Sequence, residues 1–206
     1  MSSAAFWNKI AEKYAATPVS DMAAYEQKLE ETAKYLTPES TVLELACGTG
    51  TTALHHAKNV RHIRAVDISE NMIRIARRKA QGLAIENVDF EVASIDDLPD
   101  TDGPYDMVMA HSILHLVPDL EGTINKVSAM LKPGGVFVSS TVCLSEGFWF
   151  LRPVLPLMRA IGKAPPVWFL ASETVRAHVK QSGLTIVHDW KPSSRSALFL
   201  IAQKAS

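Results

Sequence analysis

Five short apolar runs follow one another along the chain, and the stretches between them are long enough for a helix. The runs do not alternate with polar residues, which is typical of parallel strands that are buried on both faces of a sheet. They are Thr41 to Leu45, Ile63 to Val66, Val88 to Val92, Met107 to Ala110 and Val136 to Thr141. This pattern predicts an α/β fold with helices on both faces of a parallel sheet.

The last part of the chain does not continue this alternation of apolar runs and helix-length stretches. Two further apolar runs, Leu184 to Trp190 and Ala197 to Ala202, are separated by six residues, Lys191 to Ser196. Six residues cannot hold a crossover helix, so these runs are predicted to pair antiparallel as a hairpin. Ser172 is expected to begin the preceding helix, and Gly183 to end it.

Two amphipathic helices are expected before the first strand, at Ala5 to Ala15 and Asp21 to Leu36, with Ser20 as the N-cap of the second. A length of 206 residues favours one domain. We therefore expect a single domain in four parts: an N-terminal helical cap (1–37), a core (38–141), a helical lid (142–171), and a last helix with the hairpin (172–206).

Composition excludes several classes of protein. The formal net charge of -1 provides no field that would attract a polyanion, so nucleic acid is not expected as a partner. Cys47 and Cys143 stand alone and suggest neither a disulfide framework nor a cysteine zinc site, which fits a reducing cytoplasm. We recognise no targeting segment and no stretch of the about 20 apolar residues that cross a bilayer.

The first apolar run leads into a glycine turn. Gly48 and Gly50 permit positive φ and close approach of a ligand to the backbone, and the helix that follows offers free N–H groups. Asp67 ends the second run 17 residues after Gly50, about where such folds place an acid that binds ribose hydroxyls. This combination predicts a site for a nucleoside cofactor.

Glu44 distinguishes between two classes of cofactor. It lies at the end of the first run and faces the same crevice as the glycine turn, where a carboxylate would repel a pyrophosphate but suit an ammonium or sulfonium group. A nicotinamide-dependent oxidoreductase is therefore the less favoured alternative. A non-catalytic binding module with a degenerate cofactor site is the second alternative.

Five sequence blocks between Val42 and Thr141 carry a family resemblance. In order, they are Glu44 to Gly50, Val66 to Met72, Ala93 to Pro99, Tyr105-Asp106 with Ile113 to Leu116, and Leu131 to Gly135. With these blocks the chain resembles the class I S-adenosylmethionine-dependent methyltransferases, which include the ubiquinone and menaquinone methylases. The resemblance implies a Rossmann-like, doubly wound, seven-stranded sheet and S-adenosyl-L-methionine as the cofactor.

The resemblance also implies roles for individual residues. The loop residues Glu44, Ala46, Gly48, Thr49 and Gly50 would hold the methionine and ribose parts, and Asp67 would anchor the ribose. The adenine contacts would be Ile68, Met72, Ser94 and Ile95, with Asp96 as an alternative to Ser94, because the family often has an acid at that place. Ala110 and His111 would line the floor near the methyl group.

Methyl transfer from a sulfonium is an in-line displacement that requires alignment and no metal. An oxygen or carbon acceptor must also lose a proton, for which His111 and Tyr14 are the candidates. His115 is interpreted as a packed core histidine. The spacing of His111 and His115 would suit a metal on one continuous helix, but Ser112 stands where a zinc protease has its Glu, so no metal site is expected.

The acceptor is expected to be a small molecule. Ala110 to Ile113 lacks the Asn or Asp-Pro-Pro-aromatic motif of many amino methyltransferases, and the basic cluster Arg74, Arg77, Arg78 and Lys79 is interpreted as a solvated helix face. The lid (142–171), with the first helix, is expected to close an apolar pocket over the carboxyl ends of the strands. A peripheral membrane contact or a second subunit is the rival interpretation, and both monomer and homodimer remain open.

Overall fold

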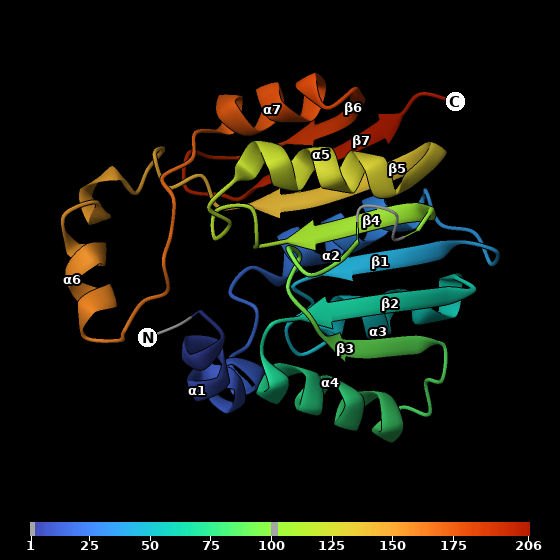
Figure 1. The fold of residues 1–206 in the computed structure, drawn as a ribbon, viewed down its shortest axis with the longest axis horizontal. Coiled ribbons are helices and arrows are strands. Elements are labelled where there is room, and N and C mark those ends of the chain that lie inside the picture. Colours follow the sequence, from blue (N-terminus) through green and yellow to red (C-terminus); the bar gives the residue numbers. More distant parts are fainter. Residues whose placement is uncertain (1–2, 100–102) are drawn as a thin grey trace.

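The computed structural model describes residues 3–99 and 103–206, in which seven strands form one sheet (Figure 1). The spatial order is β3-β2-β1-β4-β5-β7-β6. The strands are β1 (Thr41–Leu45), β2 (His62–Asp67), β3 (Val88–Val92), β4 (Tyr105–His111), β5 (Leu131–Thr141), β6 (Leu184–Trp190) and β7 (Leu198–Lys204). Strands β1 to β5 pair in parallel, and β7 is antiparallel to both β5 and β6, which confirms the predicted fold class.

Helices cover both faces of the sheet. Helices α5 and α7 lie on one face, and α2 and α3 lie on the other (Figure 1). The helices are α1 (Ser3–Ala16), α2 (Met22–Ala33), α3 (Thr51–His56), α4 (Glu70–Gly82), α5 (Leu120–Met130), α6 (Val154–Ala160) and α7 (Ser172–Gln181), with short 3-10 helices η1 (Ala57–Asn59) and η2 (Trp149–Leu151). Both faces of the central strands are therefore buried, as the unalternated apolar runs predict.

Alternation along each strand decides which face a side chain joins. Val42 and Met109 belong to the core cluster with α3 and α4, whereas Leu43 and Ala110 belong to the cluster with α5 and α7. Successive side chains of a strand point to opposite faces. Glu44 and His111 therefore both point to the α3 face, although they lie on different strands.

The order of the strands creates a crevice at the carboxyl end of the sheet. β1 has β2 on one side and β4 on the other, so the chain changes direction along the sheet between β3 and β4. In open α/β sheets, ligands bind at such a switch point, beyond the carboxyl ends of the strands. The ends of β1, β2 and β4 are therefore the expected place for the cofactor.

The N-terminal helices differ in detail from the sequence prediction. The N-cap of α2 is Asp21, whose Oδ1 accepts a hydrogen bond from the N–H of Ala24 at 3.0 Å, so the assignment to Ser20 is wrong. The helix ends at Ala33, and Tyr35 and Leu36 continue as turns. The start of a helix depends on the residue whose side chain caps it, and apolar spacing alone does not identify that residue.

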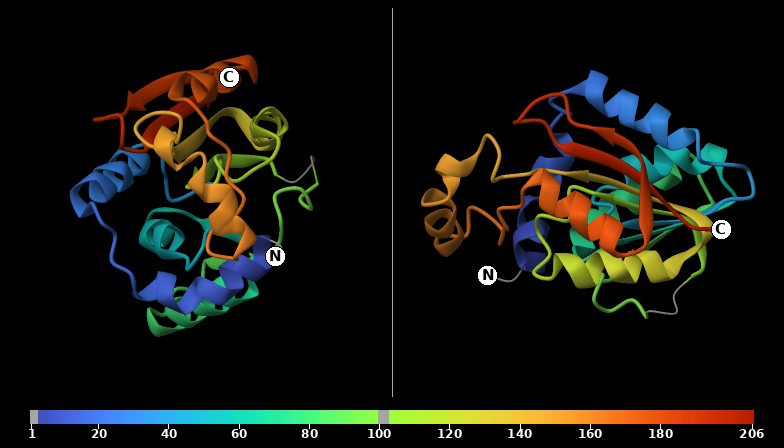
Figure 2. Two further views of the ribbon diagram at one scale, coloured as in Figure 1. Left: turned by 90° about the vertical axis from the view of Figure 1, so that its left-hand side faces the viewer. Right: turned by 90° about the horizontal axis from the view of Figure 1, so that it is seen from above.

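The insertion between β5 and α7 does not close over the sheet. It contains η2 and α6, and α6 projects from the carboxyl end of the strands (Figures 1 and 2). Six of its large apolar side chains are exposed, among them Trp149 at 70% and Leu157 at 67%. In this structure the insertion therefore does not form the lid that the sequence predicts over an apolar pocket.

Candidate functional site

The loop between β1 and α3 has the backbone that its glycines were predicted to permit. Gly48 has φ +54° and Gly50 has φ +75°. A Cβ at Gly50 would lie 2.7 Å from the Phe90 ring and 2.9 Å from the Cβ of Ala76, so only glycine fits there. A Cβ at Gly48 would meet only the Tyr14 ring, at 3.8 Å, which leaves this part of the loop accessible to a ligand.

Asp67 joins the end of β2 to this loop. One carboxylate oxygen accepts a hydrogen bond from the N–H of Gly48 at 2.9 Å, and the other accepts one from the N–H of Ser69 at 2.8 Å. Burial raises the pKa of Asp67, and the two backbone donors lower it. Each oxygen keeps a second lone pair, so the carboxylate is held in place and still able to accept hydrogen bonds from a ligand.

A cavity of about 750 Å³ adjoins the same loop. Its walls come from the end of α1, the loop before α2, one face of α2, the loop after β1, the ends of β4 and β5, and the β6–β7 connection. Of the predicted site residues, it brings together Tyr14, Glu44, Ala46, Gly48, Thr49 and His111. This volume is in the range of small-molecule sites.

Glu44 is the most unusual group in this cavity. Its side chain is buried, with 2% exposed, and Oε2 has no hydrogen-bond partner among the described residues. Burial raises the pKa of Glu44 to about 8, against a smaller lowering by the N–H of Ala53. A buried carboxyl group without a partner is costly, and a cationic ligand would relieve that cost.

His111 lies farther along the cavity, at the end of β4. Burial lowers the pKa of His111 to about 4, and the charge of Lys28 adds to this effect. Lys28 of α2 donates a hydrogen bond from Nζ to Oγ of Ser140 on β5 at 3.0 Å. His111 is therefore a neutral imidazole at pH 7 and can accept a proton there.

Tyr14 is the other candidate for proton transfer. Burial raises its pKa, and the charges of Asp67 and Glu44 raise it further. Its hydroxyl group therefore keeps its proton at neutral pH and is suited to donate a hydrogen bond. Between the two candidates, His111 is the one with a neutral ring nitrogen, Nε2, that has no hydrogen-bond partner among the described residues, although burial and Lys28 disfavour its protonated form.

The remaining predicted site residues do not line the cavity. Met72 packs with Ala11 and Ile75 between α1 and α4, because Asn8 of α1 bonds the start of α4 and brings α1 over it. Ile95 and Ala110 lie in the core cluster with α5 and α7. Four more predicted residues are absent from the lining of the cavity: Gly50, Asp67, Ile68 and Ser94.

Two further predictions, the lid and the absence of a metal site, can be compared with the structure here. Residues 142–171 do not line the cavity, which is covered from α1 and α2 instead. In the described ranges 3–99 and 103–206, His, Cys, Asp and Glu side chains form no group of three that could hold a metal ion. His115 is half-buried with its pKa lowered to about 4 by burial, and it does not line the cavity.

Sequence reasoning missed several polar residues of the cavity. Lys28 and Tyr25 stand three residues apart on α2, and Tyr25 shares a hydrogen bond of 3.1 Å with Thr52. Lys79, expected on a solvated face, donates to Oγ1 of Thr49 at 2.9 Å. The one available signal was the pairing of Tyr25 and Lys28 on the polar side of a helix just before the first strand.

Fold and site together define a class: an α/β protein with a glycine loop after β1, a cavity beside it, and a sheet that ends in an antiparallel hairpin. A family model described as a methyltransferase domain matches residues 36–183. The chain belongs to this methyltransferase domain family.

Individual relatives agree with this assignment. The chain is 34% identical over 118 residues to a demethylmenaquinone methyltransferase of Clavibacter sepedonicus, which covers 57% of this chain and 44% of that protein. It is 30% identical over 111 residues to a ubiquinone biosynthesis O-methyltransferase of Xanthomonas campestris pv. campestris, with 53% and 46% covered. The matched region is thus less than half the length of these curated relatives.

A solved structure shows the same fold. The YcgJ protein from Bacillus subtilis superposes with a TM-score of 0.71 at 18% sequence identity, covering 88% of this chain and 99% of that one.

None of the helices within residues 3–99 and 103–206 has both the length and the apolar character that a bilayer crossing requires.

Proposed function

We propose that this protein transfers the methyl group of S-adenosyl-L-methionine to a small, partly hydrophobic acceptor. When bound, this cofactor supplies a methyl group that is already activated on a sulfonium. The protein then has to bind and orient both molecules and accept a proton where the acceptor loses one.

The unpartnered carboxyl oxygen Oε2 of buried Glu44 is the observation that carries the proposal. It lies in a cavity beside the glycine loop, where a nicotinamide cofactor would place a pyrophosphate and be repelled. S-adenosyl-L-methionine instead carries an ammonium and a sulfonium group. Family membership points to the same cofactor.

The charges of the cavity also suit the two ends of the cofactor's amino-acid part. In the described residues, Nζ of Lys28 bonds only the neutral hydroxyl of Ser140, so its charge has no carboxylate bonded to it. We assign the ammonium group to Glu44, the carboxylate to Lys28, and the ribose hydroxyls to Asp67. Charge-assisted hydrogen bonds of this kind are about twice as strong as neutral ones.

His111 is proposed as the proton acceptor, with Tyr14 as a hydrogen-bond donor. The acceptor is proposed to be partly hydrophobic because the two relatives are named for quinone methylation, and because apolar residues of the insertion stand at this edge of the sheet. We also propose that the chain is a single domain, in which residues 142–171 form an insertion between the core and the last helix with its hairpin.

Calorimetry with S-adenosylhomocysteine and NAD side by side tests the cofactor assignment. We expect binding of S-adenosylhomocysteine and none of NAD, whereas the reverse result would identify an oxidoreductase. Mass spectrometry of metabolites that gain 14 Da with enzyme and S-adenosylmethionine would then identify the acceptor. Cofactor binding without any such product would favour the non-catalytic module.

Replacing Glu44 with Gln is expected to weaken S-adenosylmethionine binding by at least about thirtyfold at pH 8, because a buried charge pair loses one partner. In the wild type, affinity should rise from pH 6 to about pH 8, since the pKa of Glu44 is about 8 and binding a cation requires the ionised carboxylate. Titration calorimetry across this range would contradict the role of Glu44 if wild type and variant showed the same pH dependence.

The same substitution should have the opposite effect on the unliganded protein. The pKa of Glu44 in the folded state is raised from 4.5 to about 8, so its contribution to stability is full below pH 4.5 and lost as pH rises through 8. Glu44→Gln should therefore raise the melting temperature at pH 9 and leave it nearly unchanged at pH 5. Thermal unfolding at the two pH values also serves as the folding control for the binding experiment.

A further inference from the structure

The insertion between β5 and α7 presents a concentrated apolar surface. Six of the twelve large apolar side chains that are exposed in the described residues lie between 149 and 168, and we call them the apolar tip: Trp149, Phe150, Val154, Leu157, Ile161 and Trp168. Exposed apolar residues scattered singly need no explanation, but a concentration of this kind marks a binding surface.

The members of the apolar tip are arranged to act together. Val154, Leu157 and Ile161 follow the spacing i, i+3, i+7 along α6 and its last turn, so they share one face. The rings of Trp149 and Phe150 meet edge to face, with centroids 6.5 Å apart. The right-hand view of Figure 2 shows α6 standing clear of the rest of the molecule.

Both ends of the insertion are fixed to the body. The N–H of Trp168 bonds the carbonyl of His115 at 2.8 Å, and the N–H of Ser145 bonds the carbonyl of Leu170 at 3.1 Å. The carboxylate of Glu146 accepts hydrogen bonds from Ser172 and Lys191. These contacts anchor the base of the insertion while its middle projects.

The insertion carries a local positive charge, which indicates what kind of partner it binds. From Gly147 to Ser172 there is no Asp or Glu, whereas Arg152, Arg159 and Lys163 are all exposed. The whole chain has a formal charge of -1, so this positive charge is local. Two copies of the chain that paired these surfaces face to face would bring like charges together.

An anionic lipid surface fits all of these features. Trp and aliphatic side chains favour the boundary between headgroups and acyl chains, and Lys and Arg favour anionic headgroups. We propose that residues 147–171 bind the surface of a membrane that contains anionic phospholipids. Because α6 stands at the carboxyl ends of the strands, this docking turns that edge of the sheet toward the bilayer (Figure 1).

Flotation with phospholipid vesicles tests this proposal without cofactor or acceptor, so its outcome is independent of the proposed function. We expect the protein to float with vesicles of phosphatidylcholine and phosphatidylglycerol. With phosphatidylcholine alone, the partition coefficient should be at least about tenfold lower, because the cations lose their partners.

Two variants locate the surface. The double variant Trp149→Ser, Leu157→Ser should lower the partition coefficient on anionic vesicles at least about tenfold, since it removes two side chains that the interface would bury. Leu83→Ser is the control outside the insertion, because Leu83 is 63% exposed and is the C-cap residue of α4. Circular dichroism and melting temperatures confirm that both variants are folded.

Three results would overturn the proposal. They are no flotation of the wild type with anionic vesicles, equal flotation of the wild type and the folded double variant, and equal partition with or without phosphatidylglycerol. Self-association in analytical ultracentrifugation that the double variant abolishes, without vesicle binding, would instead assign the surface to a second copy of the chain.

Discussion

Replacing His111 with Asn is expected to lower kcat by a factor of about 10² to 10⁴, the usual contribution of a positioned general base. His111 lines the cavity, and burial and the charge of Lys28 lower its pKa to about 4, so the ring is neutral and able to accept a proton. The affinity for S-adenosylhomocysteine should stay within about threefold, because none of the assigned cofactor contacts is made by His111. Single-turnover rates at saturating cofactor, on the acceptor identified by its gain of 14 Da, measure the effect.

His115→Asn is the matched control for this variant. His115 also has its pKa lowered to about 4 by burial, but it does not line the cavity. Its replacement should leave kcat within about threefold. Equal losses in both variants would show that His111 acts through packing and not through proton transfer.

The pH profile gives an independent check on His111. The imidazole becomes protonated as pH falls through about 4, so the wild-type rate at saturating cofactor should be constant from pH 6 to 8 and fall below pH 5. The variant should lack this acid limb. If the variant kept the fall in rate below pH 5, a group other than His111 would be responsible for that fall.

Replacing Asp67 with Ala is expected to weaken S-adenosylmethionine binding by at least about a hundredfold. The substitution would remove the carboxylate that is proposed to accept two hydrogen bonds from the ribose hydroxyl groups, each worth about 1.5 to 3 kcal/mol. It also releases the N–H of Gly48, to which the carboxylate bonds at 2.9 Å, so the loop loses its anchor. Titration calorimetry with S-adenosylhomocysteine provides the measurement.

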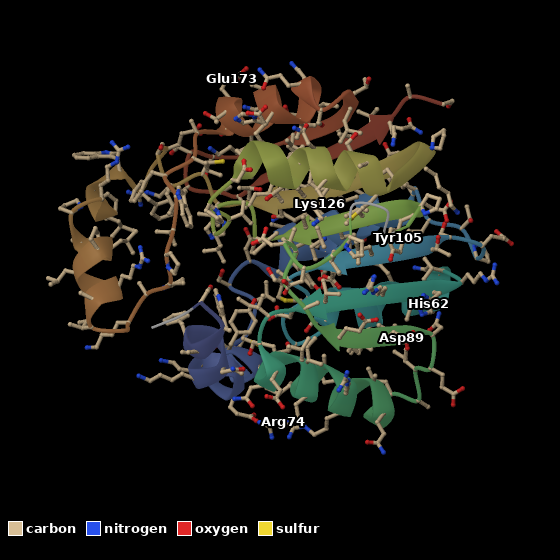
Figure 3. All side chains as sticks on the ribbon, viewed as in Figure 1. His62, Arg74, Asp89, Tyr105, Lys126 and Glu173 are labelled. Atoms are coloured by element: carbon tan, nitrogen blue, oxygen red, sulfur yellow. The ribbon has the colours of Figure 1, made fainter. Side chains whose placement is uncertain are left out.

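Asp89→Ala is the control for the loss of a carboxylate on the neighbouring strand, away from the cavity. Asp89 of β3 bonds His62 at 3.0 Å, and Figure 3 places both residues at the end of the sheet opposite α6. Its replacement should leave cofactor affinity within about threefold. An unchanged dissociation constant in folded Asp67→Ala would refute the ribose assignment.

The strands were predictable because each depends on a short stretch of sequence. Thr41–Leu45, Val88–Val92 and Leu184–Trp190 were predicted with the boundaries that the structure has. A buried strand requires an apolar run, and a parallel connection requires room for a helix, so both can be read locally. The terminal hairpin followed from a connection too short for a crossover.

The cofactor loop was predictable for the same reason. Gly48, Gly50 and Asp67 lie at fixed distances from strand ends, and parallel strands end at one edge of the sheet. The structure then added the bond between Gly48 and Asp67, which joins residues on neighbouring strands. The burial of Glu44 also required the structure, because its environment includes α3.

The positions of helices relative to the sheet were not readable from the sequence. Lys28 reaches Ser140, 112 residues away, only because α2 packs behind β4 and β5. Met72 turned out to be covered by α1, and residues 142–171 to project from the sheet. Each of these outcomes depends on contacts between segments far apart in the chain.

The sequence by itself determined the order and type of the elements, the glycine loop, and the acids at the ends of β1 and β2. Tertiary structure alone decided that Glu44, His111, Lys28 and Ser140 share one cavity, and that the apolar tip is exposed. The physical reason is that strand patterning and turn geometry are set by neighbouring residues. The docking of helices and of the insertion is set by packing and hydrogen bonds between distant segments, which a local pattern does not encode.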